Sequence, residues 1–194
     1  NAVLRASAEP FEGLTEQAFA APWDRIDALI SDSRSAASRA RGVMGGAAAV
    51  ALDRSLARID EARRANDRSA LALAAVETYR QLVEAQDAGT AAPPIPVSLL
   101  DYAGFRFDAL AQSSTVDWKA MAETARFAEE QWKLLEPQIQ SKALAGVTSE
   151  SVAGLTKAAQ AQDVAFARSA AATELALVDL LEEHVAAKPA TGAR

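Results

Sequence analysis

Two Asp residues, each preceded by an amide side chain, are the first candidates for chemistry. The pairs are Asn66-Asp67 and Gln162-Asp163, and they lie 96 residues apart in the chain. Two carboxylates that face each other can bind a cation or share a proton. Asp67 and Asp163 are therefore weak metal candidates. The alternative is that each pairs with Arg or Lys, or meets water.

The two amides fall on apolar stripes that step by three or four residues, the spacing of one buried helix face. A buried amide needs hydrogen-bond partners, because leaving it unpaired costs about 1–3 kcal/mol. Asn66 and Gln162 are therefore predicted either to line a ligand cavity or to hydrogen-bond between helices and fix their register.

The three tryptophans, Trp23, Trp118 and Trp132, could line a pocket for an apolar or cationic ligand. Their helical spacing also fits a role as core anchors. Tyr102 and Phe105 belong to the densest bulky apolar segment of the chain. This segment is predicted to plug one end of a helical bundle or, alternatively, to act as a lid over a ligand.

No catalytic set of residues is visible. The chain has no cysteine, and His184 is its only histidine. A di-metal bundle needs a Glu-x-x-His motif on each of two helices, but Leu181 stands three residues before His184. Serine nucleophiles lack a plausible histidine base. We therefore expect no cofactor and no enzymatic activity.

The composition predicts that helices position these residues. Alanine, the best helix former, supplies 48 of 194 residues, and strand-forming residues never alternate with polar ones over a long run. Gly and Pro divide the chain into segments, and residues 47–87 contain neither. The fold class is predicted as all-α, an elongated four-helix bundle with short flanking helices.

The order of short helix, helix and long helix occurs twice, with a period of about 96 residues. The sequence predicts two duplicated helical hairpins, with repeats at residues 11–88 and 98–187, inside one bundle at 1–187. The alternative is that two Ala-rich amphipathic hairpins simply look alike. Residues 188–194 are predicted to be a disordered tail.

The net charge of −6 argues against nucleic acid as a partner, and no uncharged stretch is long enough to span a bilayer. The chain begins at Asn1, so we expect a removed export signal and a periplasmic or otherwise exported location; the alternative is cytoplasmic. The expected function is non-enzymatic protein–protein interaction, with a homodimer as one form. The alternatives are a binding protein for a small molecule or metal cation between helices, and an enzyme of unknown type.

Overall fold

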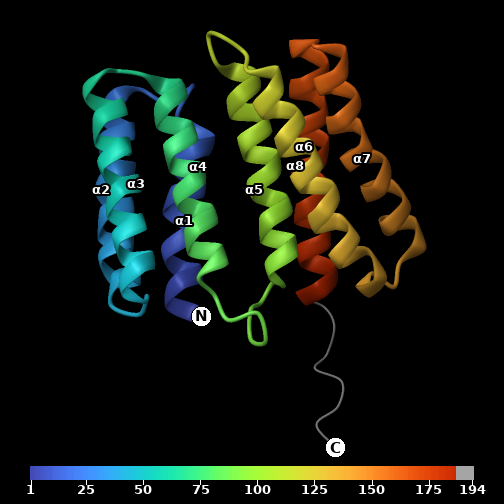
Figure 1. Ribbon diagram of the computed structural model, residues 1–194, viewed down its shortest axis with the longest axis horizontal. Coiled ribbons are helices and arrows are strands. Elements are labelled where there is room, and N and C mark those ends of the chain that lie inside the picture. The colour runs from blue at the N-terminus through green and yellow to red at the C-terminus, as the bar shows by residue number, and fades with distance from the viewer. Residues whose placement is uncertain (187–194) are drawn as a thin grey trace, which may run out of the picture. The chain divides into compact units, whose positions relative to one another are not determined.

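The computed structural model describes residues 1–186, and within them it contains helices and no strand, which confirms the predicted all-α helical bundle (Figure 1). The predicted tail at residues 188–194 lies outside the described residues. In chain order the elements are α1 (Ala2–Gln17), α2 (Trp23–Arg41), α3 (Gly46–Arg64), α4 (Arg68–Glu84), α5 (Ile95–Gln112), α6 (Trp118–Leu135), the 3-10 helix η1 (Glu136–Gln138), α7 (Lys142–Ala161) and α8 (Val164–Ala186).

Each predicted long helix is divided into two helices. The breaks fall at Asn66 and Gln162, whose backbones adopt the left-handed conformation with φ of 53° and 52°. The next residue, Asp67 or Asp163, caps the following helix. The Asp67 carboxylate accepts a hydrogen bond from the Ala70 N–H at 2.9 Å, and Asp163 caps α8 in the same way. Each predicted long helix is therefore a helical hairpin.

The chain forms two compact units, and the first contains Asn1–Gly89 and Ala109–Val116. In this unit α1 packs against α2 and α4, and α3 packs against α4. The amphipathic faces of these helices meet in a shared core, which excludes water from their large apolar side chains. Its largest fully buried members are Phe11, Leu14, Ile26, Leu52, Ile59, Leu71 and Leu82.

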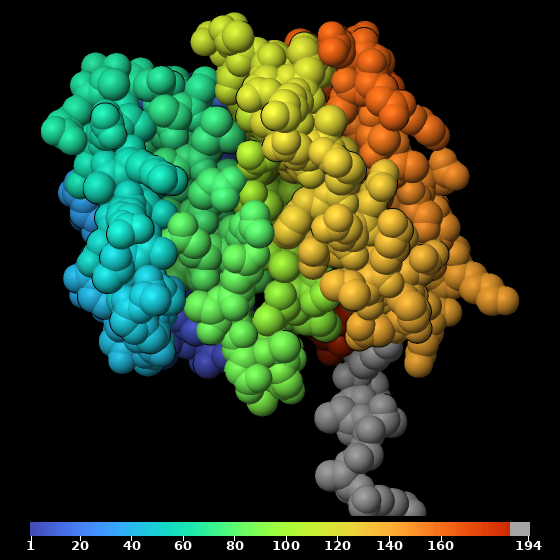
Figure 2. All heavy atoms as spheres, in the orientation of Figure 1, coloured from blue at the N-terminus to red at the C-terminus, as the bar shows by residue number. Residues whose placement is uncertain are grey.

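The second unit contains Thr90–Asp108 and the residues from Asp117 onward. Here α7 lies between α6 and α8 and packs against both; α6 and α7 are the yellow and orange layers of Figure 2. The ring of Tyr102 on α5 meets Phe127 on α6 edge to face, with centroids 5.4 Å apart. Most of α5 is buried, as expected for a helix that is apolar on nearly all sides.

The helices of the two units follow the same order at a nearly constant offset. Gly46 and Lys142 begin α3 and α7, 96 residues apart, and Arg68 and Val164 begin α4 and α8 at the same offset. We call this the 96-residue correspondence. It also holds for burial, because four buried positions of α3 match four buried positions of α7. These positions are Leu52, Ser55, Ile59 and Ala62 in α3, and Thr148, Ser151, Leu155 and Ala158 in α7.

Candidate functional site

The structure places Asn66 and Gln162 in exposed turns, so their predicted burial on apolar stripes is wrong. The left-handed break turns the chain back, and the stripe does not continue through it. The Asn66 Oδ1 accepts a hydrogen bond from Arg63 Nη1 at 2.8 Å, within its own hairpin. Both amides are hairpin-turn residues, and neither lines a cavity between helices.

Asp67 and Asp163 are also exposed, and each belongs to a different unit. Each carboxylate is occupied as an N-cap, which explains why Asp follows the amide in both places. Among residues 1–186 there is no group of three or more His, Cys, Asp or Glu side chains arranged to hold a metal ion.

The three tryptophans are not brought together. Trp118 and Trp132 lie near opposite ends of α6, and Trp23 belongs to the other unit. Trp132 is buried, and its indole N–H donates to the Ser149 hydroxyl on α7 at 2.9 Å. Trp132 therefore acts as a core anchor between two helices.

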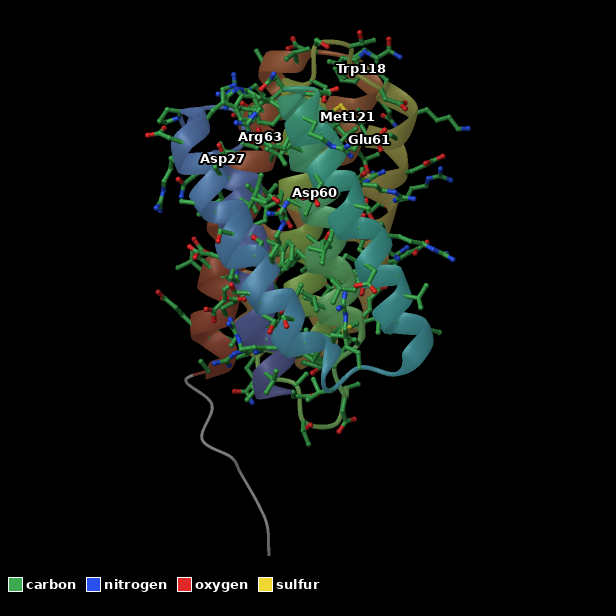
Figure 3. The ribbon with its side chains drawn as sticks, turned by 90° about the vertical axis from the view of Figure 1, so that its left-hand side faces the viewer. Asp27, Asp60, Glu61, Arg63, Trp118 and Met121 are labelled. Atoms are coloured by element: carbon green, nitrogen blue, oxygen red, sulfur yellow. The ribbon has the colours of Figure 1, made fainter. Side chains whose placement is uncertain are left out.

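Trp23 lies in a cluster of charged side chains at the α3–α4 turn. The guanidinium carbons of Arg63 and Arg68 lie 4.5 and 4.3 Å from the centroid of its ring, within cation–π range. Arg63 also donates two hydrogen bonds to Asp27, at 2.6 and 2.9 Å, and Figure 3 shows these two side chains together on α2 and α3. The hydrogen bonds from Arg63 lower the pKa of Asp27 below its ordinary value. These contacts of Trp23 and Asp27 with the two arginines join α2 to the α3–α4 turn.

Tyr102 and Phe105 are buried within α5, so they belong to the core of the second unit and are neither a lid nor an end plug. On the same helix Gly104 lies against α8. A Cβ at Gly104 would collide with the Glu174 carboxylate and lie 2.7 Å from the Leu175 side chain. The missing side chain of Gly104 therefore makes room for Glu174.

Glu174 is a carboxyl group in the core. Its exposed fraction is 1%, and neither carboxylate oxygen has a hydrogen-bond partner among the described residues. Burial, with a smaller contribution from the charge of Asp101, raises the pKa of Glu174 well above its ordinary value. Sequence reasoning missed this group because a Glu on an Ala-rich helix is usually solvated.

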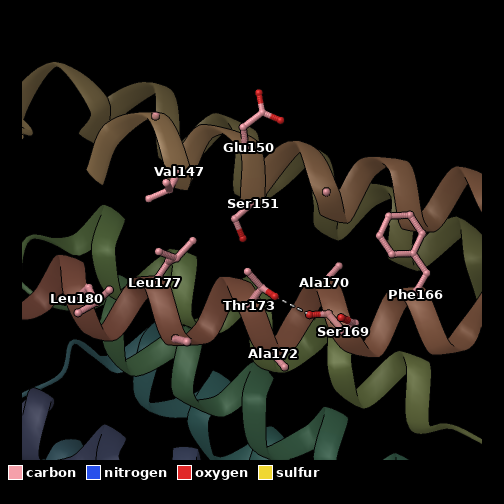
Figure 4. Close-up of a pocket in the computed structure, with 13 residues that line it drawn as sticks. Val147, Glu150, Ser151, Phe166, Ser169, Ala170, Ala172, Thr173, Leu177 and Leu180 are labelled. Atoms are coloured by element: carbon pink, nitrogen blue, oxygen red, sulfur yellow. Dashed lines mark hydrogen bonds between the residues drawn. The ribbon is translucent and has the colours of Figure 1, made fainter. Parts of the chain in front are cut away.

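A groove of about 910 Å³ lies between α7 and α8, and we call it the α7/α8 groove (Figure 4). Its floor and walls are mainly small or apolar. Val147, Phe166 and Leu180 stand on its walls with exposed fractions of 50%, 41% and 49%. Its other lining residues are Gly146, Glu150, Ser151, Gly154, Ser169, Ala170, Ala172, Thr173, Ala176 and Leu177.

One polar atom of this groove lacks a partner. Ser151 points from α7 toward α8 in Figure 4, and its Oγ is buried without a hydrogen bond to any described residue. Its counterpart in the 96-residue correspondence, Ser55, accepts a hydrogen bond from Gln81 Nε2 at 2.8 Å. The counterpart of Gln81 is Leu177, which cannot make that bond.

The first unit has a hollow at the corresponding place, the α3/α4 groove of about 450 Å³, lined by Arg58, Glu61, Ala62, Ala65, Asp67, Ala70, Leu73, Ala74 and Glu77. Four charged side chains, Arg58, Glu61, Asp67 and Glu77, line this hollow. The counterparts of Arg58 and Leu73 in the α7/α8 groove are Gly154 and Ser169. Ala176 and Leu180 of the α7/α8 groove correspond to Arg80 and Glu84, which pair with each other at 2.7 Å on α4 outside the lining of the α3/α4 groove. The α7/α8 groove, with Glu150 as its charged lining residue, is therefore less polar than the α3/α4 groove.

No helix within residues 1–186 is long and apolar enough to cross a membrane. No protein-family model, no curated protein and no solved structure matches this chain.

Proposed function

We propose that this protein is a non-enzymatic binding protein that docks helices of a protein partner in the α7/α8 groove. The observation that carries the proposal is the exposed apolar lining of this groove, at a place where the α3/α4 groove is covered by its own polar side chains. Contiguous exposed apolar surface is costly in water and commonly marks an interaction site.

The shape of the groove favours a helix as its occupant. It runs between two helices, and its small residues leave space for another helix to approach closely. Helix-in-groove recognition places apolar side chains at helical spacing into such a hollow. Val147, Phe166 and Leu180 would supply the apolar contacts on the walls.

We also propose that the two units arose by duplication of one four-helix unit. Matching helix starts, matching turn residues at Asn66 and Gln162, and matching caps at Asp67 and Asp163 support this history. In this view the α3/α4 groove kept its polar cover, and the α7/α8 groove diverged toward binding.

Site-specific photo-crosslinking tests the function. A benzophenone amino acid replaces Thr173 in the groove, and a control chain carries it at Leu134, which is 61% exposed on α6 of the same unit. In cells of the source organism, we expect a protein adduct from position 173 that is absent from position 134. The adduct should disappear when Val147→Glu is added, because a charge in the groove opposes apolar docking.

The control for that substitution is Val50→Glu, at a valine of the first unit with the same exposed fraction of 50%. It should leave the adduct unchanged. Equal adducts from positions 173 and 134, or an adduct that survives Val147→Glu, would contradict the proposal.

A small apolar ligand is the second candidate, and the unpartnered Ser151 hydroxyl favours it. Such a ligand would carry one hydrogen-bonding group for Ser151. Native mass spectrometry of the protein purified from its source would reveal a bound mass that is lost on denaturation. A bare polypeptide mass would remove this candidate.

A further inference from the structure

We infer that the connection between α2 and α3 is a tip that docks the protein on an anionic lipid surface. We call residues 42–50 the α2–α3 tip: the four residues between the two helices and the first five residues of α3. The tip belongs to the first unit, so the inference goes beyond the proposed function, which concerns a groove of the second unit.

The tip is exposed and yet has no polar side chain. Residues 42–52 are all Gly, Ala, Val, Met or Leu. Val43 and Val50 have exposed fractions of 57% and 50%, and Ala47 between them is exposed as well. Apolar area in contact with water is unfavourable, so a run of it at one end of a unit marks a surface that binds an apolar partner.

The folding of the first unit does not account for this composition. Gly45 is the N-cap of α3, but it has no side chain to accept a hydrogen bond from the helix, and its φ of −68° suits other residues equally well. A Cβ at Gly45 or Gly46 would meet no atom within 4 Å. A Ser or Asp at the N-cap would stabilise α3. The tip therefore keeps small apolar residues at some cost to its own helix.

The corresponding connection of the second unit, between α6 and α7, is polar. Its Ser141 hydroxyl accepts a hydrogen bond from the Leu144 N–H at 3.2 Å and caps α7. Ile139, a large apolar residue of this connection, is buried. The polar side chains belong to Glu136, Gln138, Gln140, Ser141 and Lys142. The fold can therefore build this connection from polar residues, and the apolar tip is particular to the first unit.

Arginines lie where the apolar tip meets the sides of the helices. Arg39 and Arg41 belong to the last turn of α2, and Arg54 follows Val50 by one turn on the same side of α3. Arg41 pairs with Asp53. Arg39 and Arg54 are exposed, and within residues 1–186 neither guanidinium group has a hydrogen bond or ion pair. Both are available to bind lipid phosphate groups.

The acidic side chains at this end of the first unit are already engaged. The N-terminal end of α1 and the C-terminal end of α4 lie at the same end as the tip (Figure 1). Glu84 pairs with Arg80 at 2.7 Å, and the Asp87 carboxylate accepts a hydrogen bond from the Gly89 N–H at 3.1 Å. The free charges beside the tip are therefore positive, which favours an anionic lipid surface over an uncharged apolar partner.

The spacing along α3 suits a tip that enters the lipid while its arginines stay at the phosphates. Arg54 lies about 12 Å along α3 from the first residue of that helix, at 1.5 Å per residue. Peripheral protein elements bury their apolar faces about 5–10 Å into the boundary between headgroups and acyl chains. The apolar tip is small, so we expect reversible binding with half-saturation at about 0.1–1 mM lipid, no tighter than a single myristoyl chain.

A fluorescent label at the tip is the first test. The chain has no cysteine, so a single introduced cysteine takes a single label. Val43→Cys of the full chain, labelled with a nitrobenzoxadiazole dye, should emit at shorter wavelength when vesicles of phosphatidylcholine and phosphatidylglycerol in equal parts are added. The same dye at Leu134→Cys, 61% exposed on α6, should not respond. No response at position 43, or equal responses at both positions, would overturn the inference.

Flotation of the unlabelled chain with the same vesicles tests the apolar contact. Val50→Glu should weaken vesicle binding at least about tenfold, because it sets a charge among the acyl chains. Val147→Glu, at a valine of the second unit with the same exposed fraction of 50%, is the matched control and should bind like the wild type. Equal weakening by both substitutions would overturn the tip as the contact.

The arginines are tested by removing their charges. Arg39→Gln and Arg54→Gln should each weaken binding to the mixed vesicles about fivefold, and vesicles of phosphatidylcholine alone should bind the wild type more weakly still. Arg126→Gln, at an exposed arginine of α6, is the control and should have no effect. Equal binding to both kinds of vesicle would overturn the anionic character of the surface.

The two valine substitutions separate this inference from the proposed function. Val50→Glu should lose the vesicles and keep the crosslinked adduct from position 173, and Val147→Glu should do the reverse. An adduct without vesicle binding would overturn the lipid surface and leave the groove proposal standing. A tip label that responds to a membrane-free cell extract but not to vesicles would also overturn the inference, in favour of a protein partner at the tip.

Discussion

At the scale of single residues, Glu174 is unusual because it is an acidic side chain buried in an apolar core. The 96-residue correspondence pairs it with Thr78, which is also buried but satisfies its hydroxyl by donating to the Ala74 carbonyl at 2.7 Å. The same offset pairs Gly104 with Ala8. The second unit therefore has no Cβ at position 104, beside the carboxyl group of Glu174, which is larger than the Thr78 side chain. The second unit therefore holds an acid where the first holds a small, self-satisfied side chain.

Removing the ionisable group should stabilise the protein at neutral pH. The pKa of Glu174 is raised in the folded state and close to its ordinary value of 4.5 in the unfolded state. The folded state thus binds more protons between these two values, and stability falls as pH rises through the folded-state pKa. Glu174→Gln should be more stable than wild type at about pH 8, by on the order of 1 kcal/mol.

Urea unfolding from about pH 5 to pH 8 measures this effect. The wild type should lose stability across the range, and Glu174→Gln should be flatter. Glu183→Gln, at an exposed position of the same helix, should keep the wild-type slope. Parallel slopes for wild type and Glu174→Gln would show that Glu174 does not titrate in the core.

Gly104 and Glu174 should be energetically coupled. Gly104→Ala places a methyl group against the Glu174 carboxylate and the Leu175 side chain, and overpacking of this kind costs about 1–3 kcal/mol. In combination with Glu174→Thr, which removes the carboxylate that lies against position 104, the same alanine should cost at least about 1 kcal/mol less. A double-mutant cycle measures the difference, and additive effects would contradict the coupling.

At the scale of the helices, the two hairpin turns share a backbone conformation but use different residues for it, Asn66 and Gln162. Both turn residues have positive φ, which costs a residue other than glycine roughly 1–2 kcal/mol and is tolerated best by Asn. Gln162→Gly should therefore stabilise the protein by about 1 kcal/mol. Asn66→Gly should gain less, because it also loses the hydrogen bond from Arg63. Thermal unfolding of the two variants should show the larger gain at position 162.

Much of the helical layout was predictable from the sequence. Trp23 and Trp118 each begin a helix, and Pro and Gly mark the major connections. The breaks at Asn66 and Gln162 were not predicted. The spacing of three and four residues continues across them, and no Gly or Pro marks them. The repeated amide-Asp pair was the available signal, because Asp is a favoured N-cap.

The groove could not be predicted for a related reason. The spacing of three and four residues extends one apolar stripe from α7 to Phe166, but the turn at Gln162 reverses the chain, and this side chain lies on an exposed groove wall. Which side of a helix is covered depends on the helices beside it, and local spacing does not give that information. Tyr102 and Phe105 illustrate the opposite case. Their segment was correctly identified as strongly apolar, yet its place in the core required the packing of α6 and α8 around it.

At the scale of the whole molecule, the two units form an internal comparison. The buried positions of α3 recur as buried positions of α7, while the α3/α4 and α7/α8 grooves differ in polarity. Core positions are constrained by packing in both units, so they can match without a shared function. Surface positions face no such constraint. Differences between the two grooves, such as Gly154 in the place of Arg58, therefore carry more information about binding than the matching core positions do.

The same reasoning predicts that folding and association respond in opposite directions to one change. Gly146→Ala with Gly154→Ala should stabilise the monomer by up to about 1 kcal/mol for each site, since alanine favours the helix and each Cβ enters open space. The added methyl groups should hinder a partner helix that approaches the α7/α8 groove, and so weaken its binding. Urea unfolding measures the first effect, and the yield of the crosslinked adduct from position 173 measures the second.

Gly13→Ala supplies the control, because Gly13 also lies within a helix, and a Cβ there meets no atom within 4 Å. It should raise stability by a similar amount and leave association unchanged. A gain in stability cannot weaken binding through misfolding, so a loss of adduct confined to the α7 pair would place the partner helix against these two glycines. Unchanged association in the α7 pair would show that no backbone approaches there, and the glycines of the groove would then lack a role in binding.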